Sequence, residues 1–253
     1  MPRRASHRLG GVAVALALTA TACGSGKPAA LPLCTSGDVV LTTEQTANAA
    51  TIAGVGKRLG LPNHAVTVAL ATAFQESNLR NLSYGDRDSL GLFQQRPSQG
   101  WGLASDIRVP RLAAAKFYQH LLRIPGWATL PVTEAAQRVQ HSAAGEAYAQ
   151  WEDPSRTLAR ALTGEVAAGL TCQFELPRKA TVSGALTADA VAELGPGGLA
   201  RAGTPAIAWA TASWLVAHAQ AYGVSHIRMS GKAWNAKRGT WKVDPAATRL
   251  VWS

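Results

Sequence analysis

The stretch from Ala65 to Asn78, AVTVALATAFQESN, decides the fold, because it places one carboxylate at the end of an almost wholly apolar helix. Apolar side chains cover nearly every face of this helix, which is typical of a helix that is buried on all sides. Burial and the negative end of the helix dipole both favour the protonated form of the Glu76 carboxyl group. A carboxylic acid that keeps its proton near neutral pH suits a general acid for glycosidic bond cleavage.

A second motif follows this helix at a short distance. Glu76–Ser77 is followed by Gly91–Leu92–Phe93–Gln94, with the polar segment 84–88 between them and residues 94–101 after them. Glu-Ser followed by Gly-Leu-(Met/Phe)-Gln resembles the soluble lytic transglycosylase and goose-type lysozyme-like group, in a branch of secreted Gram-positive proteins. The resemblance implies a lysozyme-like helical domain with a small β-lobe, which cleaves the glycan strand of peptidoglycan.

The same resemblance implies which residues contact the substrate. Glu76 matches the catalytic acid, and Ser77 matches a residue that orients the acid or the sugar, although a Ser at a helix end also serves as a cap. Gln94 matches the substrate-binding Gln, with a surface position as the alternative, and Gln95 extends the polar cleft wall. Tyr118 lies where the family has a helix after this motif, and core packing is its alternative role.

Asp86 and Asp88 are the candidates for a second carboxylate. A glycosidase that uses water needs two carboxyl groups at a defined separation, and these two lie in a turn near the expected cleft. The alternative is that both aspartates bond to local N–H groups and arginines within that turn.

A lytic transglycosylase needs only one acid, which the resemblance assigns to Glu76. The acid protonates the glycosidic oxygen and then takes the proton of the sugar's own C6 hydroxyl group, which gives a 1,6-anhydro product. The family often carries a Tyr-Asn pair on a later helix. This chain has Gln140 in the corresponding region without an accompanying Tyr, which leaves the choice between transglycosylase and hydrolase open.

The beginning of the chain predicts export. Three arginines precede a short apolar run at 12–18, and Ala20–Thr21–Ala22 leads into Cys23. This is the pattern of a signal peptide, and small residues before a Cys resemble a bacterial lipobox. We therefore expect a lipoprotein on the outer face of the cell membrane, anchored through Cys23, with simple secretion as the alternative.

Three cysteines in an exported protein leave one thiol to be explained. If Cys23 carries lipid, Cys34 and Cys172 remain as a pair that would clasp the two ends of the predicted domain, with two unpaired buried thiols as the alternative. Neither has a Cys or His within ligand spacing, so no metal site is expected.

The chain is basic, with 25 Lys and Arg against 15 Asp and Glu. Outside a cell, such a charge favours contact with anionic wall polymers and lipids. No nucleic-acid-binding motif accompanies the charge, so nucleic acid is not an expected partner, and we expect no cofactor.

Composition and turn signals divide the chain into five parts, in a fold that is α+β and mostly α. They are an export signal (1–22), a tether (23–33), the lysozyme-like domain (34–172), a linker (173–205) and a small α/β C-terminal module (206–253). Most of the Trp residues lie near the C-terminus, where core packing is favoured over sugar stacking.

Local signals predict the individual elements. They include a capping box at Thr42 and Gln45, caps at Asn63 and Asp153, a helix opened by Pro110, a helix from Thr133 to about His141, a hairpin or irregular β-lobe within 81–95, a short helix at 188–194, a helix at 207–222, and strands at 226–229, 233–242 and 248–252.

These observations lead to one functional expectation, a peptidoglycan lytic transglycosylase that cuts between N-acetylmuramic acid and N-acetylglucosamine. The alternatives are a muramidase of the same fold, which would use water, and a non-catalytic scaffold that binds the wall. Retention of both Glu76 and Gln94 argues against the scaffold.

Overall fold

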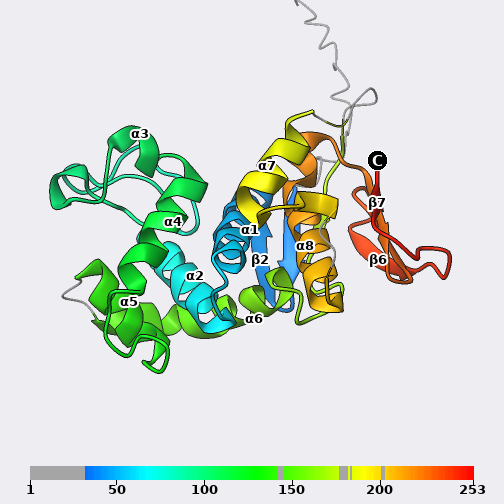
Figure 1. The fold of residues 1–253 in the computed structure, drawn as a ribbon. Coiled ribbons are helices and arrows are strands. Elements are labelled where there is room, and N and C mark those ends of the chain that lie inside the picture. Colours follow the sequence, from blue (N-terminus) through cyan, green and yellow to red (C-terminus); the bar gives the residue numbers. More distant parts are fainter. Residues whose placement is uncertain (1–31, 142–144, 177–181, 183, 201–202) are drawn as a thin grey trace, which may run out of the picture. The chain divides into compact units, whose positions relative to one another are not determined.

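The computed structural model describes residues 32–141, 145–176, 182, 184–200 and 203–253, and these residues all belong to one compact unit. They form helices and two small antiparallel sheets, so the predicted α+β class is confirmed (Figure 1). The α-helices are α1 (Thr43–Arg58), α2 (Asn63–Ser77), α3 (Ala104–Ile107), α4 (Pro110–Leu121), α5 (Val132–Gln140), α6 (Glu152–Leu162), α7 (Ala185–Leu194) and α8 (Pro205–Tyr222).

Helix α1 begins as its sequence predicts. The Thr42 hydroxyl accepts a hydrogen bond from the Gln45 amide at 3.2 Å, and the Gln45 side chain accepts one from the Thr42 amide at 2.9 Å. The capping box is therefore confirmed. The helix ends just before Gly60, whose positive φ of 73° stops the helical path.

Two predicted caps are wrong, while the opening of α4 at Pro110 is confirmed. The N-cap of α2 is Pro62, and Asn63 is the first helical residue. The N-cap of α6 is Trp151, so that Asp153 lies inside the first turn. Near an N-terminus, an acidic side chain still interacts favourably with the helix dipole without serving as the cap.

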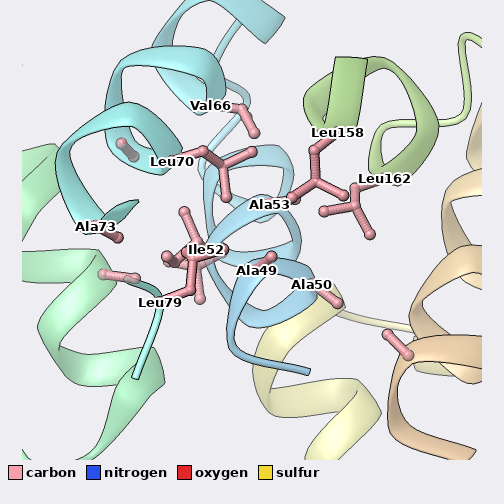
Figure 2. Close-up of a cluster of buried hydrophobic side chains, with 14 of the residues drawn as sticks. Ala49, Ala50, Ile52, Ala53, Val66, Leu70, Ala73, Leu79, Leu158 and Leu162 are labelled. Atoms are coloured by element: carbon pink, nitrogen blue, oxygen red, sulfur yellow. The ribbon is translucent and has the colours of Figure 1, made fainter. Parts of the chain in front are cut away.

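Helices α1 and α2 form the centre of the core (Figure 2). Small residues on α1 let its neighbours approach closely. A Cβ atom at Gly56 would lie 2.7 Å from the Tyr118 hydroxyl of α4, which donates a hydrogen bond to the Ile52 carbonyl at 2.9 Å. The sequence predicts the burial of α2, and α1 is buried over most of its length as well.

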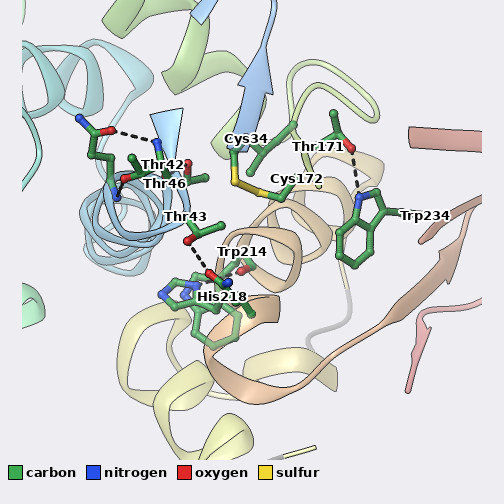
Figure 3. Close-up of a disulfide and its surroundings, with 12 residues drawn as sticks. Cys34, Thr42, Thr43, Thr46, Thr171, Cys172, Trp214, His218 and Trp234 are labelled. Atoms are coloured by element: carbon green, nitrogen blue, oxygen red, sulfur yellow. Dashed lines mark hydrogen bonds between the residues drawn. A yellow bond between two sulfur atoms is a disulfide. The ribbon is translucent and has the colours of Figure 1, made fainter. Parts of the chain in front are cut away.

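The first sheet joins the two ends of the region 33–173. Strand β1 (Leu33–Ser36) lies between β2 (Val39–Thr42) and β3 (Thr171–Gln173), and its register places Cys34 directly opposite Cys172. These two residues form a disulfide, which confirms the predicted pairing (Figure 3).

Helices α7 and α8 pack against α1. Trp214 of α8 donates a hydrogen bond from Nε1 to the Glu193 carboxylate of α7 at 2.7 Å, and His218 stacks on the Trp214 ring. Burial lowers the pKa of His218, so its ring is neutral within this contact. The predicted short helix at 188–194 is thus part of a longer, packed helix.

The second sheet follows α8 and has the strand order β6-β5-β4-β7. Its strands are β4 (His226–Met229), β5 (Lys232–Asn235), β6 (Thr240–Val243) and β7 (Val251–Trp252). The bounds predicted for β4 are confirmed. The single strand predicted at 233–242 is wrong, because the chain turns between Asn235 and Thr240 to form a hairpin.

Residues 81–95 are built of turns, and their strand-like pairing is the single bridge between Leu90 and Gln95. This segment is therefore irregular rather than a hairpin of strands. Within the ranges that the structure describes, no helix has both the length and the hydrophobicity needed to cross a bilayer.

Candidate functional site

Glu76 lies in the last turn of α2, where the helix reaches the surface of the core. The helix ends at Asn78, which adopts the left-handed conformation with φ 52°. As a result Glu76 is half-buried, whereas residues 65–74 of the same helix are buried. The apolar sequence of α2 predicts a more deeply buried carboxylate than this.

Ser77 and Gln140 hold the Gly-Leu-Phe-Gln loop next to this carboxylate. The Ser77 hydroxyl donates a hydrogen bond to the Leu92 carbonyl at 2.8 Å. The Gln140 amide, at the end of α5, donates one to the Phe93 carbonyl at 2.7 Å. Two residues predicted to bind substrate therefore fix the backbone of the motif that contains Gln94.

Gly91 and Gln94 both adopt left-handed backbone conformations, with φ 74° and 46°. A Cβ atom at Gly91 would lie 2.6 Å from the Ile107 carbonyl oxygen, so only glycine fits there. The Gln94 amide donates hydrogen bonds to the carbonyls of Gly91 at 3.1 Å and Tyr84 at 3.4 Å. Gln94 is only partly exposed, and its side chain braces the turn before it.

Tyr148 is the site residue that sequence reasoning missed. It lies in a 3₁₀ segment, η2 (Gly145–Trp151), and its hydroxyl donates a hydrogen bond to Glu76 Oε1 at 2.8 Å. Tyr148 is only 1% exposed, so a buried phenol supports the half-buried carboxylate. The signal in the sequence is an aromatic residue after the helix where the Tyr-Asn pair is expected.

The same segment fixes the last turn of α2 from a second side. Trp151 Nε1 donates a hydrogen bond to Gln75 Oε1 at 2.8 Å, and the Trp151 ring stacks on Phe74 with a centroid distance of 5.0 Å. Segment η2 thus holds Gln75 and Phe74, the two residues before Glu76. This limits the directions in which the Glu76 carboxylate can point.

Two residues predicted to contact substrate lie in the core instead. Gln95 is 1% exposed, and its amide donates a hydrogen bond to the Ala113 carbonyl of α4 at 3.1 Å. Tyr118 is fully buried between α4 and α1, and burial raises the pKa of its phenol. Both side chains connect elements of the fold.

Asp86 and Asp88 differ in their surroundings. The Asp88 carboxylate accepts hydrogen bonds from the Ser98 amide at 2.8 Å and from Arg96 Nε at 2.9 Å. These donors hold the pKa of Asp88 well below its usual range, so it is ionised. Asp86 is 87% exposed at its side chain and lies 3.9 Å from Arg87.

The structure thus brings together Glu76, Tyr148, Ser77, Gln140 and the backbone of the Gln94 loop. Within its described ranges there is no cluster of three or more His, Cys, Asp or Glu side chains that would hold a metal ion. In comparisons with known proteins, the chain matches no protein-family model and no curated protein.

Proposed function

We propose that this protein is a peptidoglycan lytic transglycosylase with a lysozyme-like catalytic region. The observation that carries the proposal is the hydrogen bond from Tyr148 to Glu76 beside the Gly-Leu-Phe-Gln loop. This hydrogen bond supports a catalytic role for Glu76. A carboxylate kept only for structure usually pairs with a cation, and no cation pairs with Glu76 among the described residues.

In the proposed mechanism, the Glu76 carboxyl group donates its proton to the oxygen of the bond between N-acetylmuramic acid and N-acetylglucosamine. The bond from C1 to that oxygen breaks while the substrate's N-acetyl oxygen bonds to C1. The C6 hydroxyl oxygen then attacks C1 and displaces the N-acetyl oxygen. Glu76, now a carboxylate, takes the C6 hydroxyl proton, so the acid is regenerated and no water is consumed.

The surroundings of Asp88 favour this one-acid mechanism over the muramidase. A carboxylate that activates water or attacks C1 must face the sugar with a free oxygen. Both oxygens of Asp88 accept hydrogen bonds from Arg96 or Ser98. Asp86 is exposed and keeps free carboxylate oxygens, so its part in the reaction is tested by the variant Asp86→Asn.

The products released from purified peptidoglycan test the proposal. We expect mass spectrometry to find muropeptides with 1,6-anhydro ends, which are lighter by one water than the reducing ends that a muramidase leaves. Reducing ends alone would replace the transglycosylase with the hydrolase. Intact glycan strands would point to a wall-binding scaffold.

Replacing the Tyr148 hydroxyl should slow the reaction without stopping it. Glu76 gains negative charge as it gives up its proton, and a hydrogen bond to a charged group is worth about 1.5–3 kcal/mol, so Tyr148→Phe should lower kcat/KM by roughly 10- to 100-fold. Tyr222→Phe is a matched control, since it removes a phenol that bonds to Asp189 on α7. Equal activities for the two variants would contradict the role of Tyr148.

We also propose that the protein is exported and anchored through lipid on Cys23, which lies outside the described residues. Its substrate would then be peptidoglycan beside the membrane. A Cys23→Ala form should appear in the medium, whereas continued membrane retention of that form would exclude the lipid anchor.

A further inference from the structure

The region of the second sheet carries half of the chain's net charge of +10. Residues 226–253 contain six Lys and Arg side chains against one Asp, a net charge of +5. The region 34–172 contains twelve Lys and Arg against eleven Asp and Glu, a net charge of +1. The charge is therefore concentrated in the smallest part of the fold.

The strand register places two of these cations, Arg228 and Lys242, on one face of the sheet. Arg228 on β4 lies opposite Ala233 on β5, which in turn lies opposite Lys242 on β6. Directly opposite residues share a face of an antiparallel sheet. Arg228 and Lys242 are exposed, so this row lies on the outer face. Since strands are about 4.8 Å apart, the two cations stand roughly 10 Å from each other.

The turn between β5 and β6 adds two more cations beside this row. Lys237 and Arg238 are both exposed. Asp244, just after β6, is paired with Arg228 at 2.7 Å, and within the described ranges no carboxylate forms an ion pair with the other cations of this region. We call Arg228, Lys237, Arg238 and Lys242 the basic face.

The opposite face of the sheet holds the large aromatic side chains. Trp234 and Trp241 lie opposite each other and point inward, where their Nε1 atoms donate hydrogen bonds to Thr171 at 3.0 Å and to the Leu170 carbonyl at 2.9 Å. Trp252 shares this inner face through its pairing with Ile227. Proteins that dock on a bilayer surface usually insert such side chains, and here they are used for packing.

We propose that the basic face binds an anionic polymer of the cell wall with repeating phosphodiester groups. Exposed cations on β4, on β6 and in the turn before β6 can meet successive phosphates along an extended chain, and the short side chain of Ala233 between β4 and β6 lets the chain approach. The binding would hold the enzyme in the wall through a surface on the second sheet, whereas Glu76 lies on helix α2.

The test is a titration of the mature protein with purified poly(glycerol phosphate) at several salt concentrations. In the variant Lys237→Gln/Arg238→Gln/Lys242→Gln we expect binding at low salt to weaken at least tenfold. The slope of log K against log salt should become less steep by about 2, because each phosphate contact on a flexible chain contributes about 0.7.

A control variant with the same change in charge shows whether binding depends on this surface or only on the net charge of the protein. Arg108→Gln/Arg111→Gln/Arg123→Gln removes three exposed cations on and around α3 and α4. It should bind within twofold of the unaltered protein. Equal weakening in both variants would overturn the proposal. Absence of polymer binding would overturn it too, even if the protein still bound vesicles that contain anionic phospholipid.

Discussion

The variant Glu76→Gln should lose about 10²- to 10⁴-fold in glycan-cleaving activity, which is the usual contribution of a general acid and base. The substitution preserves the size of the side chain and leaves an amide oxygen that can still accept the hydrogen bond from Tyr148. In the proposed mechanism it removes the proton for the glycosidic oxygen and the carboxylate that later accepts the C6 hydroxyl proton. Initial rates of muropeptide release give the loss directly.

Two matched variants make this result interpretable. Glu146→Gln makes the same chemical change at an exposed position of η2, two residues from Tyr148, and should leave the rate unchanged. Asp86→Asn should retain most of the activity and still yield anhydro ends. If Asp86→Asn abolished turnover while Glu76→Gln only weakened it, the reaction would need two carboxylates and the one-acid mechanism would be wrong.

Loss of the disulfide should have the largest effect on stability. Cys34 and Cys172 are 138 residues apart, and closing a loop of that length lowers the entropy of the unfolded chain by an amount worth about 4–5 kcal/mol. We expect Cys34→Ala/Cys172→Ala to lower the free energy of unfolding by that amount and the melting temperature by roughly 10–20 °C. Urea titrations followed by circular dichroism measure the change.

The unaltered protein in reductant is the control for this variant, because it lacks the same bond but keeps both sulfur atoms. The two should unfold at similar urea concentrations, and the oxidised protein at a much higher one. A shift below about 1 kcal/mol would contradict the entropic argument. Alkylation of both thiols without reductant would show that the bond does not form.

Local signals in the sequence predict the ends of elements well only where no stronger constraint competes. Thr42 and Gln45 form the expected capping box, since both partners lie within one turn. Asn63 fails as a cap because Pro62 before it is already extended, with φ −69° and ψ 162°, and takes the cap position itself. Proline fixes its own φ regardless of the polar residue that follows.

The candidate site is harder to predict, because its contacts join distant parts of the chain. The hydrogen bond from Tyr148 to Glu76 spans 72 residues and starts from a 3₁₀ segment, where no helical periodicity marks the residue that faces inward. The sequence also does not show which of the neighbouring residues Gln94 and Gln95 is exposed. In the fold the first is partly exposed and the second is buried against α4.

The pairing of β1 with β3 also determines the order in which the chain can assemble. Strand β1 enters the fold first, yet its partner β3 arrives only after α1 to α6 have been supplied. Contacts between such distant segments form slowly, because a long loop must close before they stabilise anything. During synthesis, β1 therefore lacks its partner until residues 171–173 have been added to the chain. A chain stopped before Thr171 would keep one open sheet edge and one free thiol at Cys34.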